Sequence, residues 1–260
     1  MDTLELGLKG KVAMVTGASE GLGRACAERF ARSGARVAMC ARRADILDAA
    51  ASGIRDTTGA EVLAVPADVT RPPDVEGFFA AVARRFGGVD ILVNNAGTSA
   101  AAAFEAVTDR AWQDDIDLKL LAAIRFCRLV IPLMKARGGG AIVNVTTIGG
   151  KAPAARSLPT SVTRAAGINL TKALATEYAA DGIRVNTVCL GIVKSAQWTR
   201  RATGDLDTYY REVAQQRQIP VGRVGEPEEF ADLVAFLVSD RARFITGAAV
   251  NFDGGASAVV

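Results

Sequence analysis

The stretch TGASEGLGRA, residues 16–25, follows an apolar run at 11–17 and opens a segment with helical periodicity. Three glycines, Gly17, Gly21 and Gly23, give it the spacing GxxxGxG. Glycine permits a tight turn and lets the backbone come close to a pyrophosphate, while the N-terminus of the following helix offers free N–H groups and the positive end of its dipole. A glycine pattern alone is a weak signal, but its place between a strand and a helix is the context that such a loop requires. The stretch therefore predicts a phosphate-binding loop.

Around this loop, apolar runs alternate with segments of helical periodicity along the whole chain. The runs are mostly continuous, which is typical of strands that are buried on both faces. Repeated β–α alternation predicts an α/β fold with a doubly wound, Rossmann-type parallel sheet and helices on both faces. No linker divides the chain, so residues 1–260 are expected to form a single domain. Strands are expected at 11–17, 35–41, 61–67, 89–97, 140–147, 182–191 and 248–255.

Composition excludes several classes of function. The 31 basic and 28 acidic residues are scattered, so neither a nucleic acid nor a membrane surface is expected as a partner. No run is long enough to cross a bilayer, and MDTLELGLKG at the start lacks the regions of a signal peptide, so a cytoplasmic protein is expected. Four widely spaced cysteines without a CxxC pair argue against a disulfide framework or a zinc site. The complete lack of histidine excludes imidazole catalysis and histidine-ligated metals, and we expect no metal site.

The end of the second expected strand, CARR, indicates which nucleotide the loop binds. A carboxylate at this point usually binds a free ribose 2′-hydroxyl, but here Ala41 is followed by Arg42 and Arg43. A guanidinium suits a 2′-phosphate by its charge and its bidentate geometry. NADP(H) is therefore favoured over NAD(H), with Arg42 as the contact. The alternative, that the arginines begin a solvated helix face, is expected to hold for one of the two.

The least regular part of the sequence is the charged segment 195–227, which contains Trp198 and the pair Tyr209–Tyr210. Long irregular segments in compact α/β domains are often lids over a ligand site. We expect a lid whose aromatic residues cover the reactive end of the cofactor and bind a small-molecule substrate. The alternative is a solvated surface excursion.

Together these motifs resemble the short-chain dehydrogenase/reductase family over nearly the whole chain. TGASEGLG is similar to the family's TGxxxGxG, Asp68 in PADV to the acid that holds the adenine amino group, and NNAG at 94–97 to the run after strand four. RVGEPEEFA, FITG and DGG match the closing third. The resemblance implies a seven-stranded parallel sheet, a nicotinamide dinucleotide and a homotetramer. It places the cofactor contacts at Gly17, Ser19, Gly21, Leu22, Gly23, Arg42, Asp68, Val69, Asn95, Ala96, Gly97, Arg164, Gly191 and Val193.

The family's catalytic set is asparagine, serine, tyrosine and lysine, and this chain departs from it at all four positions. In the family the tyrosine donates a proton to the substrate carbonyl, the lysine lowers the tyrosine pKa and holds the ribose, the serine positions the carbonyl, and the asparagine supports a water. The serine position is occupied by Thr147 in NVTTIGG, and the tyrosine and lysine positions by Thr160 and Arg164. The asparagine position is occupied by Lys119 in WQDDIDLKL.

The change at Thr160 is the severe one, because an aliphatic hydroxyl is far less acidic than a phenol. Loss of a positioned general acid typically costs on the order of 10²–10⁴ in rate. Lys119 is the best replacement, since burial and the neighbouring Arg164 would lower its pKa. The alternative is that Lys119 points to solvent or pairs with Asp115 or Asp117. Further candidates, each expected to be a surface or packing residue, are Lys151, Lys194, Tyr209 and Tyr210.

Three functions are compatible with these residues. The favoured one is an NADP-dependent oxidoreductase that acts on a small carbonyl, enone or imine. The second is a non-redox lyase or decarboxylase that uses Lys119, Arg164 and Thr147 to stabilise an anion. The third is a catalytically silent NADP-binding protein. The intact nucleotide loop favours the first and third functions, and the segment 195–227 with its aromatic residues favours the first and second, so the first is preferred.

Overall fold

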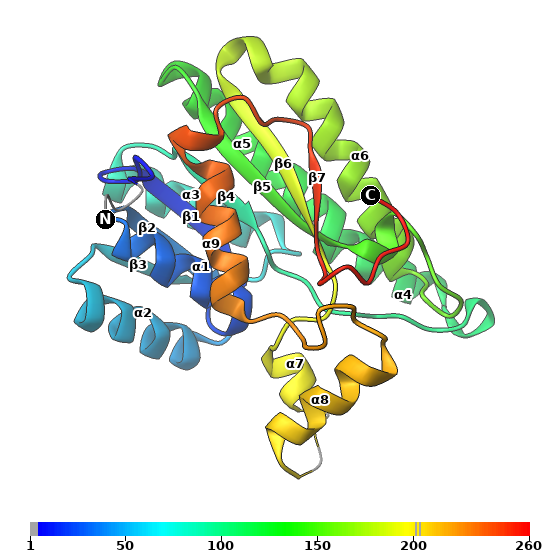
Figure 1. Cartoon of the computed structure of the whole chain (residues 1–260). Helices are drawn as coiled ribbons and strands as arrows, with labels where there is room; N and C mark the ends of the chain where they lie inside the picture. Colours follow the sequence, from blue (N-terminus) through cyan, green and yellow to red (C-terminus); the bar gives the residue numbers. More distant parts are fainter. Residues whose placement is uncertain (1–4, 201, 203) are drawn as a thin grey trace.

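The computed structural model describes residues 5–200, 202 and 204–260. Its strands are β1 (Val12–Thr16), β2 (Arg36–Ala41), β3 (Val62–Pro66), β4 (Ile91–Asn94), β5 (Gly140–Thr147), β6 (Ile183–Leu190) and β7 (Ala249–Phe252). They form one seven-stranded sheet in the order β3-β2-β1-β4-β5-β6-β7, and every neighbouring pair is parallel (Figure 1). The predicted fold class and sheet are therefore confirmed.

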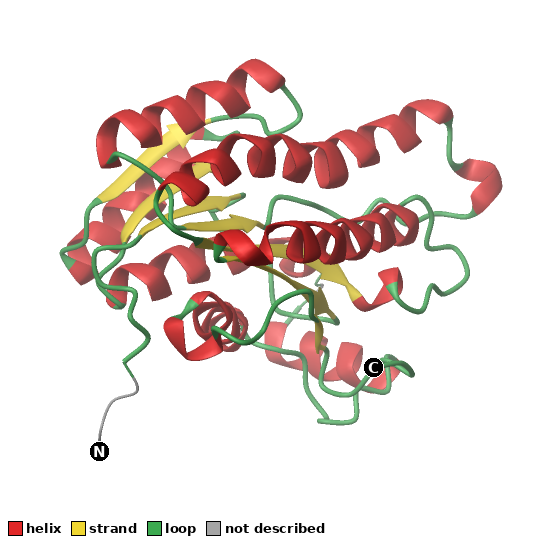
Figure 2. Ribbon diagram, turned by 90° about the horizontal axis from the view of Figure 1, so that it is seen from above, coloured by secondary structure: helices red, strands yellow, loops and turns green. Residues whose placement is uncertain are grey.

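Helices cover both faces of this sheet (Figure 2). They are α1 (Gly21–Arg32), α2 (Ala44–Thr58), α3 (Pro72–Phe86), α4 (Asp109–Ile116), α5 (Ala122–Ala136), α6 (Thr160–Tyr178), α7 (Ala196–Thr199), α8 (Leu206–Gln216) and α9 (Pro227–Val238). A π-helical turn, η2 (Asp117–Leu121), joins α4 to α5. One hydrophobic core packs α1, α2 and α9 against the sheet, and a second core packs α3, α5 and α6 against its other face.

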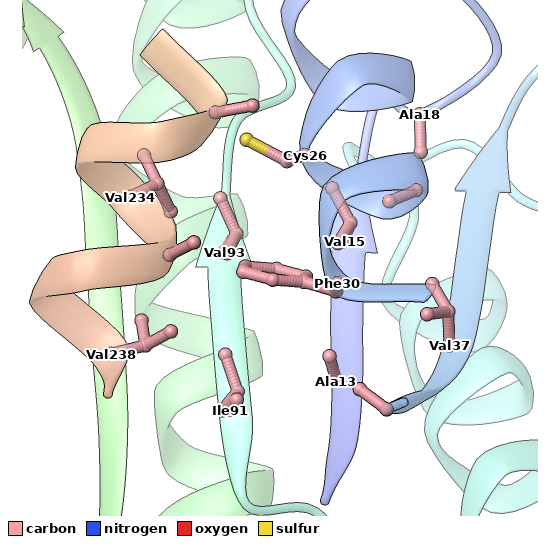
Figure 3. Close-up of a cluster of buried hydrophobic side chains, with 14 of the residues drawn as sticks. Ala13, Val15, Ala18, Cys26, Phe30, Val37, Ile91, Val93, Val234 and Val238 are labelled. Carbon is pink, nitrogen blue, oxygen red and sulfur yellow. The ribbon is translucent and has the colours of Figure 1, made fainter. Parts of the chain in front are cut away.

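Phe30 shows how the periodicity of α1 builds the first core. Cys26, Ala27 and Phe30 recur at helical spacing and are all fully buried. The Phe30 ring lies among Val15 of β1 and Val93 of β4, and α9 closes the cluster (Figure 3). The glycine loop that precedes α1 is therefore fixed to the sheet by a fully packed helix.

All four cysteines are free and buried. Cys26 belongs to the first core, whereas Cys40 and Cys127 belong to the second. Burial raises the pKa of every one of these thiols, including that of Cys189 on β6, so they are small core residues and not nucleophiles.

The order in which strands are added to the sheet reverses between β1 and β4, which are parallel neighbours. The connection from β1 leads to one edge and the connection from β4 to the other, so the loops after these two strands diverge. In open α/β sheets, ligands bind in the crevice that forms at this switch point. The glycine loop follows β1 and the NNAG run ends β4, so the two motifs meet there.

The segment 195–227 is irregular only in part, which corrects our expectation. It contains α7 and α8, which lie outside the body of the sheet in Figure 1. Tyr210 is only 5% exposed and packs with Val213 and Ile219 in a small core of the segment's own, while Trp198 and Tyr209 pack against that core. Tyr210 therefore stabilises the segment. Residues 201 and 203 of this segment lie outside the described residues.

Within the part of the chain that the structure describes, no helix combines the length and the apolar character that a membrane span requires.

Candidate active site

The glycine loop is tied to the loop that follows β4. The Asn95 amide donates to the carbonyls of Thr16 at 2.9 Å and of Gly17 at 3.0 Å. A Cβ atom on Gly23 would lie 2.3 Å from the Gly17 carbonyl oxygen, and one on Gly17 would lie 2.9 Å from Cα of Ala96. Gly17 also has a φ of +64°, which L side chains rarely adopt. Only glycine fits these two positions, because the two loops approach each other so closely.

The first turn of α1 fits a phosphate group. Its N-cap residue, Glu20, makes no side-chain capping bond and pairs instead with Arg43 and, at 3.4 Å, with Arg200. The N–H groups of the first turn therefore remain available to an anion, and the helix dipole favours one there. Gly21 has a φ of +54°, and a Cβ atom on it would meet nothing nearer than 3.7 Å, on Ser195 of the segment before α7. There is therefore free space between the backbone of this turn and Ser195.

The two arginines after β2 have different surroundings. Arg43 is bonded to Glu20, as expected for one of the pair. Arg42 is exposed and lies close enough to Asp68 to act on its charge. Partial burial raises the pKa of the Asp68 carboxyl, but two hydrogen bonds from Thr70 and the charge of Arg42 outweigh it, so this pKa lies below its ordinary value. Asp68 is therefore a fixed anion beside Arg42.

The predicted contacts on the other side of the site lie near the end of β6. The N–H of Gly191 donates to Phe252 of β7 at 2.9 Å, and a Cβ atom on Gly191 would lie 2.7 Å from Asp253, so this position also requires glycine. Val193 forms an isolated bridge with Gly225. The side chains at the remaining apolar and hydroxyl positions of the predicted cradle are buried or half-buried: Ser19, Leu22, Val69 and Val193.

Thr160 and Lys119 are brought together across 41 residues of sequence. Thr160 is the first residue of α6, and its Oγ1 accepts hydrogen bonds from Lys119 Nζ and from the backbone N–H of Ala100, both at 2.9 Å. Lys119 lies in the π-helical turn η2, and its side chain is completely buried. Short π-turns are frequent at functional sites. The lysine that the sequence singles out thus contacts the residue at the proton-donor position.

Lys119 also pairs with Asp115, so the two alternatives left open by the sequence hold at once: it is ion-paired, and it faces the site. Burial lowers the pKa of Lys119 to about 8, and the charge of Arg164 acts in the same direction. The bond to Asp115 opposes this shift. Lys119 is therefore a cation at neutral pH that releases its proton far more readily than an exposed lysine does.

The guanidinium of Arg164 is buried beside the NNAG run. Its Nη1 donates to the Val145 carbonyl of β5 at 2.6 Å, and a Cβ atom on Gly97 would lie 2.5 Å from Nη2. Burial lowers the pKa of Arg164 to about 10, which still leaves it charged at neutral pH. Arg164 is thus a fixed cation at the end of β4 and cannot serve as the acid.

Behind these residues lies a cavity of about 20 Å³, lined by Lys119, Arg164, Asn94 and Asn144 among others. Asn94 Oδ1 and Arg164 Nε are buried and have no hydrogen-bond partner among the described residues. One is an acceptor and the other a donor, and a cavity of this size admits a single water molecule. The cavity suits one water that would bridge the end of β4 and Arg164.

Three further candidate residues, Thr147, Lys151 and Lys194, are not hydrogen-bonded to Lys119, Thr160 or Arg164 among the described residues. Thr147 ends β5 and is half-buried, and no hydrogen bond among residues 5–200, 202 and 204–260 joins it to Thr160 or Arg164. Lys151 donates to the carbonyl of Ala249 and to Asn251, both at 2.6 Å. Those bonds, like the pairing of Lys194 with Glu226, agree with the expectation that both lysines have structural roles.

Sequence reasoning missed Thr163 and the N–H of Ala100. Thr163 donates to the second oxygen of Asp115 at 2.6 Å, and Ala100 anchors Thr160 through its backbone. Thr163 lies one turn after Thr160, a spacing that could have indicated it. The contact of a backbone N–H cannot be predicted from the type of residue, because nearly every residue has this group.

The sheet order, the open first turn of α1 and the fixed glycines define a dinucleotide-binding scaffold of the doubly wound class. Comparison with known proteins extends this. The family model described as enoyl-(acyl carrier protein) reductase matches residues 17–257. The 3-oxoacyl-(acyl-carrier-protein) reductase of Vibrio cholerae is 35% identical over 250 residues, which cover 96% of this chain and 98% of that protein.

Solved structures give the same result. L-sorbose reductase from Gluconobacter frateurii, in complex with NADPH and L-sorbose, is 38% identical with a TM-score of 0.94, and the match covers 99% of this chain and 100% of that one. An NADPH-bound short chain oxidoreductase from Pseudomonas aeruginosa, described as containing an atypical catalytic center, is 37% identical with a TM-score of 0.94, covering 98% and 99%. The chain belongs to the short-chain dehydrogenase/reductase family.

Proposed function

We propose that this protein is an NADP(H)-dependent oxidoreductase that reduces a small ketone, and that Lys119 and Thr160 together deliver the proton. The observation that carries the proposal is the hydrogen bond of 2.9 Å from the buried Lys119 amine to Thr160 Oγ1. It places an ammonium group directly behind the residue that stands at the proton-donor position.

The hydrogen bonds that Thr160 Oγ1 accepts indicate the direction in which a proton would be transferred. A hydroxyl has two acceptor lone pairs and one hydrogen. Lys119 and the Ala100 N–H occupy both lone pairs, so the hydroxyl hydrogen is left to donate to a substrate oxygen. Bound NADPH supplies the hydride. As the carbonyl oxygen takes the Thr160 proton, Lys119 donates a proton to Thr160 Oγ1, and solvent later reprotonates the amine.

The relay removes the difficulty that an aliphatic hydroxyl is a poor acid. Thr160 never has to exist as a free alkoxide, because Lys119, with a pKa of about 8, replaces its proton in the same step. Arg164 would hold the cofactor ribose next to Gly97, and Thr147 would position the carbonyl. The cofactor residues proposed for the phosphates are those of the glycine loop, with Arg42 at the 2′-phosphate.

Two of the relatives named above support a ketone, whereas the description of the family model, an enoyl-(acyl carrier protein) reductase, keeps a conjugated C=C bond as the second candidate substrate. Both 3-oxoacyl thioesters and L-sorbose carry a ketone, and the enzymes named for them are reductases. The NADPH found with the two solved relatives supports NADP(H) here. A relative with an atypical centre supports the view that an altered set can belong to a working enzyme. Neither a lyase nor a decarboxylase gains support from these comparisons. A homotetramer remains part of the proposal on the family resemblance.

The test is NADPH consumption, followed by nicotinamide absorbance, with a panel of ketoses, 3-oxoesters, cyclic enones and cyclic imines. We expect turnover with at least one ketone. Lys119→Met and Thr160→Val should each lower kcat by on the order of 10²–10⁴. The control is Lys135→Met, because Lys135 pairs with Asp181 on the surface, and it should leave kcat unchanged. Failure of every ketone, or full activity of Thr160→Val, would overturn the proposal.

A further inference from the structure

Asp115 is the most deeply buried acid of the site and the mechanism above does not use it. It lies on α4 and is only 4% exposed. One carboxylate oxygen binds Lys119 Nζ, and the other accepts from Thr163 Oγ1 of α6 at 2.6 Å. A buried carboxylate is costly unless its charge and lone pairs are satisfied. Here both oxygens are used, and they join η2 to α6.

The charges around Asp115 come from two elements. Lys119 of η2 is its direct partner, and the charge of Arg164 on α6 interacts with both Asp115 and Lys119. Two cations and one anion thus share a buried site. Without Asp115, the two cations would face each other with no counter-charge, and the Lys119 side chain would have no anchor on α4.

We propose that Asp115 is a positioning residue for proton delivery, holding the Lys119 amine on Thr160 Oγ1 and locking α4 and η2 to the first turn of α6. The inference rests on the proposed function. Thr163 is the matching contact on α6, since it binds Asp115 through its side chain and lies one turn after Thr160. The three-point arrangement of Asp115, Lys119 and Thr163 fixes where the ammonium hydrogen points.

The direction of the electrostatic effect follows from the same contacts. Asp115 raises the pKa of Lys119 against the lowering effects of burial and Arg164. Loss of this carboxylate therefore moves the Lys119 pKa further below about 8. At neutral pH a larger fraction of the amine is then uncharged and has no proton to give.

The variant Asp115→Asn keeps the shape and removes the charge. With the best ketone from the panel, we expect kcat to fall at least tenfold at neutral pH, with little change in KM, and the alkaline limb of the pH profile to move to lower pH. Asp114→Asn is the matched control, because Asp114 is on the same helix but exposed and paired with Arg110. It should change neither kcat nor the limb.

A second readout needs no turnover. The chain has seven lysines, so ¹³C resonances of their side chains can be titrated and that of Lys119 assigned from Lys119→Met. We expect its midpoint to be lower in Asp115→Asn than in the parent protein, and unchanged in Asp114→Asn. Should Asp115→Asn fail to fold, Thr163→Val tests the same link, with an expected loss in kcat and a smaller shift. NADPH affinity and the melting temperature serve as checks on folding.

The outcomes separate the two proposals. If the parent protein reduces ketones but Asp115→Asn keeps its kcat and its alkaline limb, the positioning role is wrong and the proposed function stands. If no ketone is reduced while Asp115→Asn lowers the Lys119 midpoint, the reductase proposal fails and the control of Lys119 by Asp115 stands. An unchanged midpoint overturns the role of Asp115 in either case.

Discussion

Two adjacent arginines after β2 illustrate how far a single residue's surroundings decide its role. Arg43 is already bonded to Glu20, whereas Arg42 is exposed and lies close to Asp68. The different surroundings of the two arginines support the proposal that Arg42 is the contact for the 2′-phosphate. A 2′-phosphate that binds Arg43 would have to compete with Glu20 for its guanidinium, and no such competitor is bonded to Arg42 among the described residues.

Arg42→Ala should weaken NADPH binding by about 1.5–3 kcal/mol, the value of a charge-assisted contact, and leave NADH binding unchanged. Arg43→Ala is the control and should cost less than about 1 kcal/mol, because it removes only a surface ion pair. Fluorescence titration of the two cofactors gives the dissociation constants. Equal affinities of the parent protein for NADPH and NADH would contradict this assignment.

The titration of Lys119 predicts the pH dependence of reduction. The protonated amine is the form that donates, and its pKa is about 8. We therefore expect kcat/KM for reduction to be level at neutral pH and to fall about tenfold per unit above that pKa. In Lys119→Arg this alkaline limb should disappear together with most of the activity, since a guanidinium does not release its proton in this range. A limb that persists in Lys119→Arg would assign the titration to another group.

At the scale of helices and strands, mostly continuous apolar runs predicted all the strands of the sheet, because strands covered on both faces are rich in apolar residues. The helices α7 and α8 were missed, although their signals are present. Asp205 caps α8 through its side chain, and Tyr210, Val213 and Ala214 recur at helical spacing. The charged residues between them gave the segment the composition of a loop. Its small core is made within the segment, which the pattern of the main sheet does not reveal.

We propose that this segment, 195–227, closes over the bound cofactor. It contacts the glycine loop through Arg200 and Glu20, and Gln197 accepts from Thr98 Oγ1 at 3.1 Å in the loop after β4. Limited proteolysis should cut within 195–227 in the free protein, and NADPH should slow that cleavage at least severalfold. Cleavage at an unchanged rate with saturating NADPH would mean that the segment does not close on the cofactor.

For the molecule as a whole, the sequence predicted the fold and the glycine loop in more detail than the contacts among the candidate catalytic residues. Close backbone contacts require glycine at positions 17 and 23. Such a requirement produces a fixed glycine spacing, which is visible in the sequence itself. The contact between Lys119 and Thr160 depends on how a π-turn and the start of α6 meet, 41 residues apart in sequence. For Lys119 the sequence left pairing with Asp115 and a place in the site as alternatives, and the structure shows that it contacts both Asp115 and Thr160.

The burial of the four cysteines gives the protein built-in reporters of local opening. Cys26 lies beneath α1 and α9, and Cys127 lies on the opposite face of the sheet on α5. A thiol reagent can modify either one only when its own face opens, so mass spectrometry of the labelled peptides measures the opening of each face separately. If the two faces unfold as one cooperative unit, both thiols should react at the same rate in mild denaturant. A rate for one that exceeds the other tenfold would identify the face of the sheet that opens first.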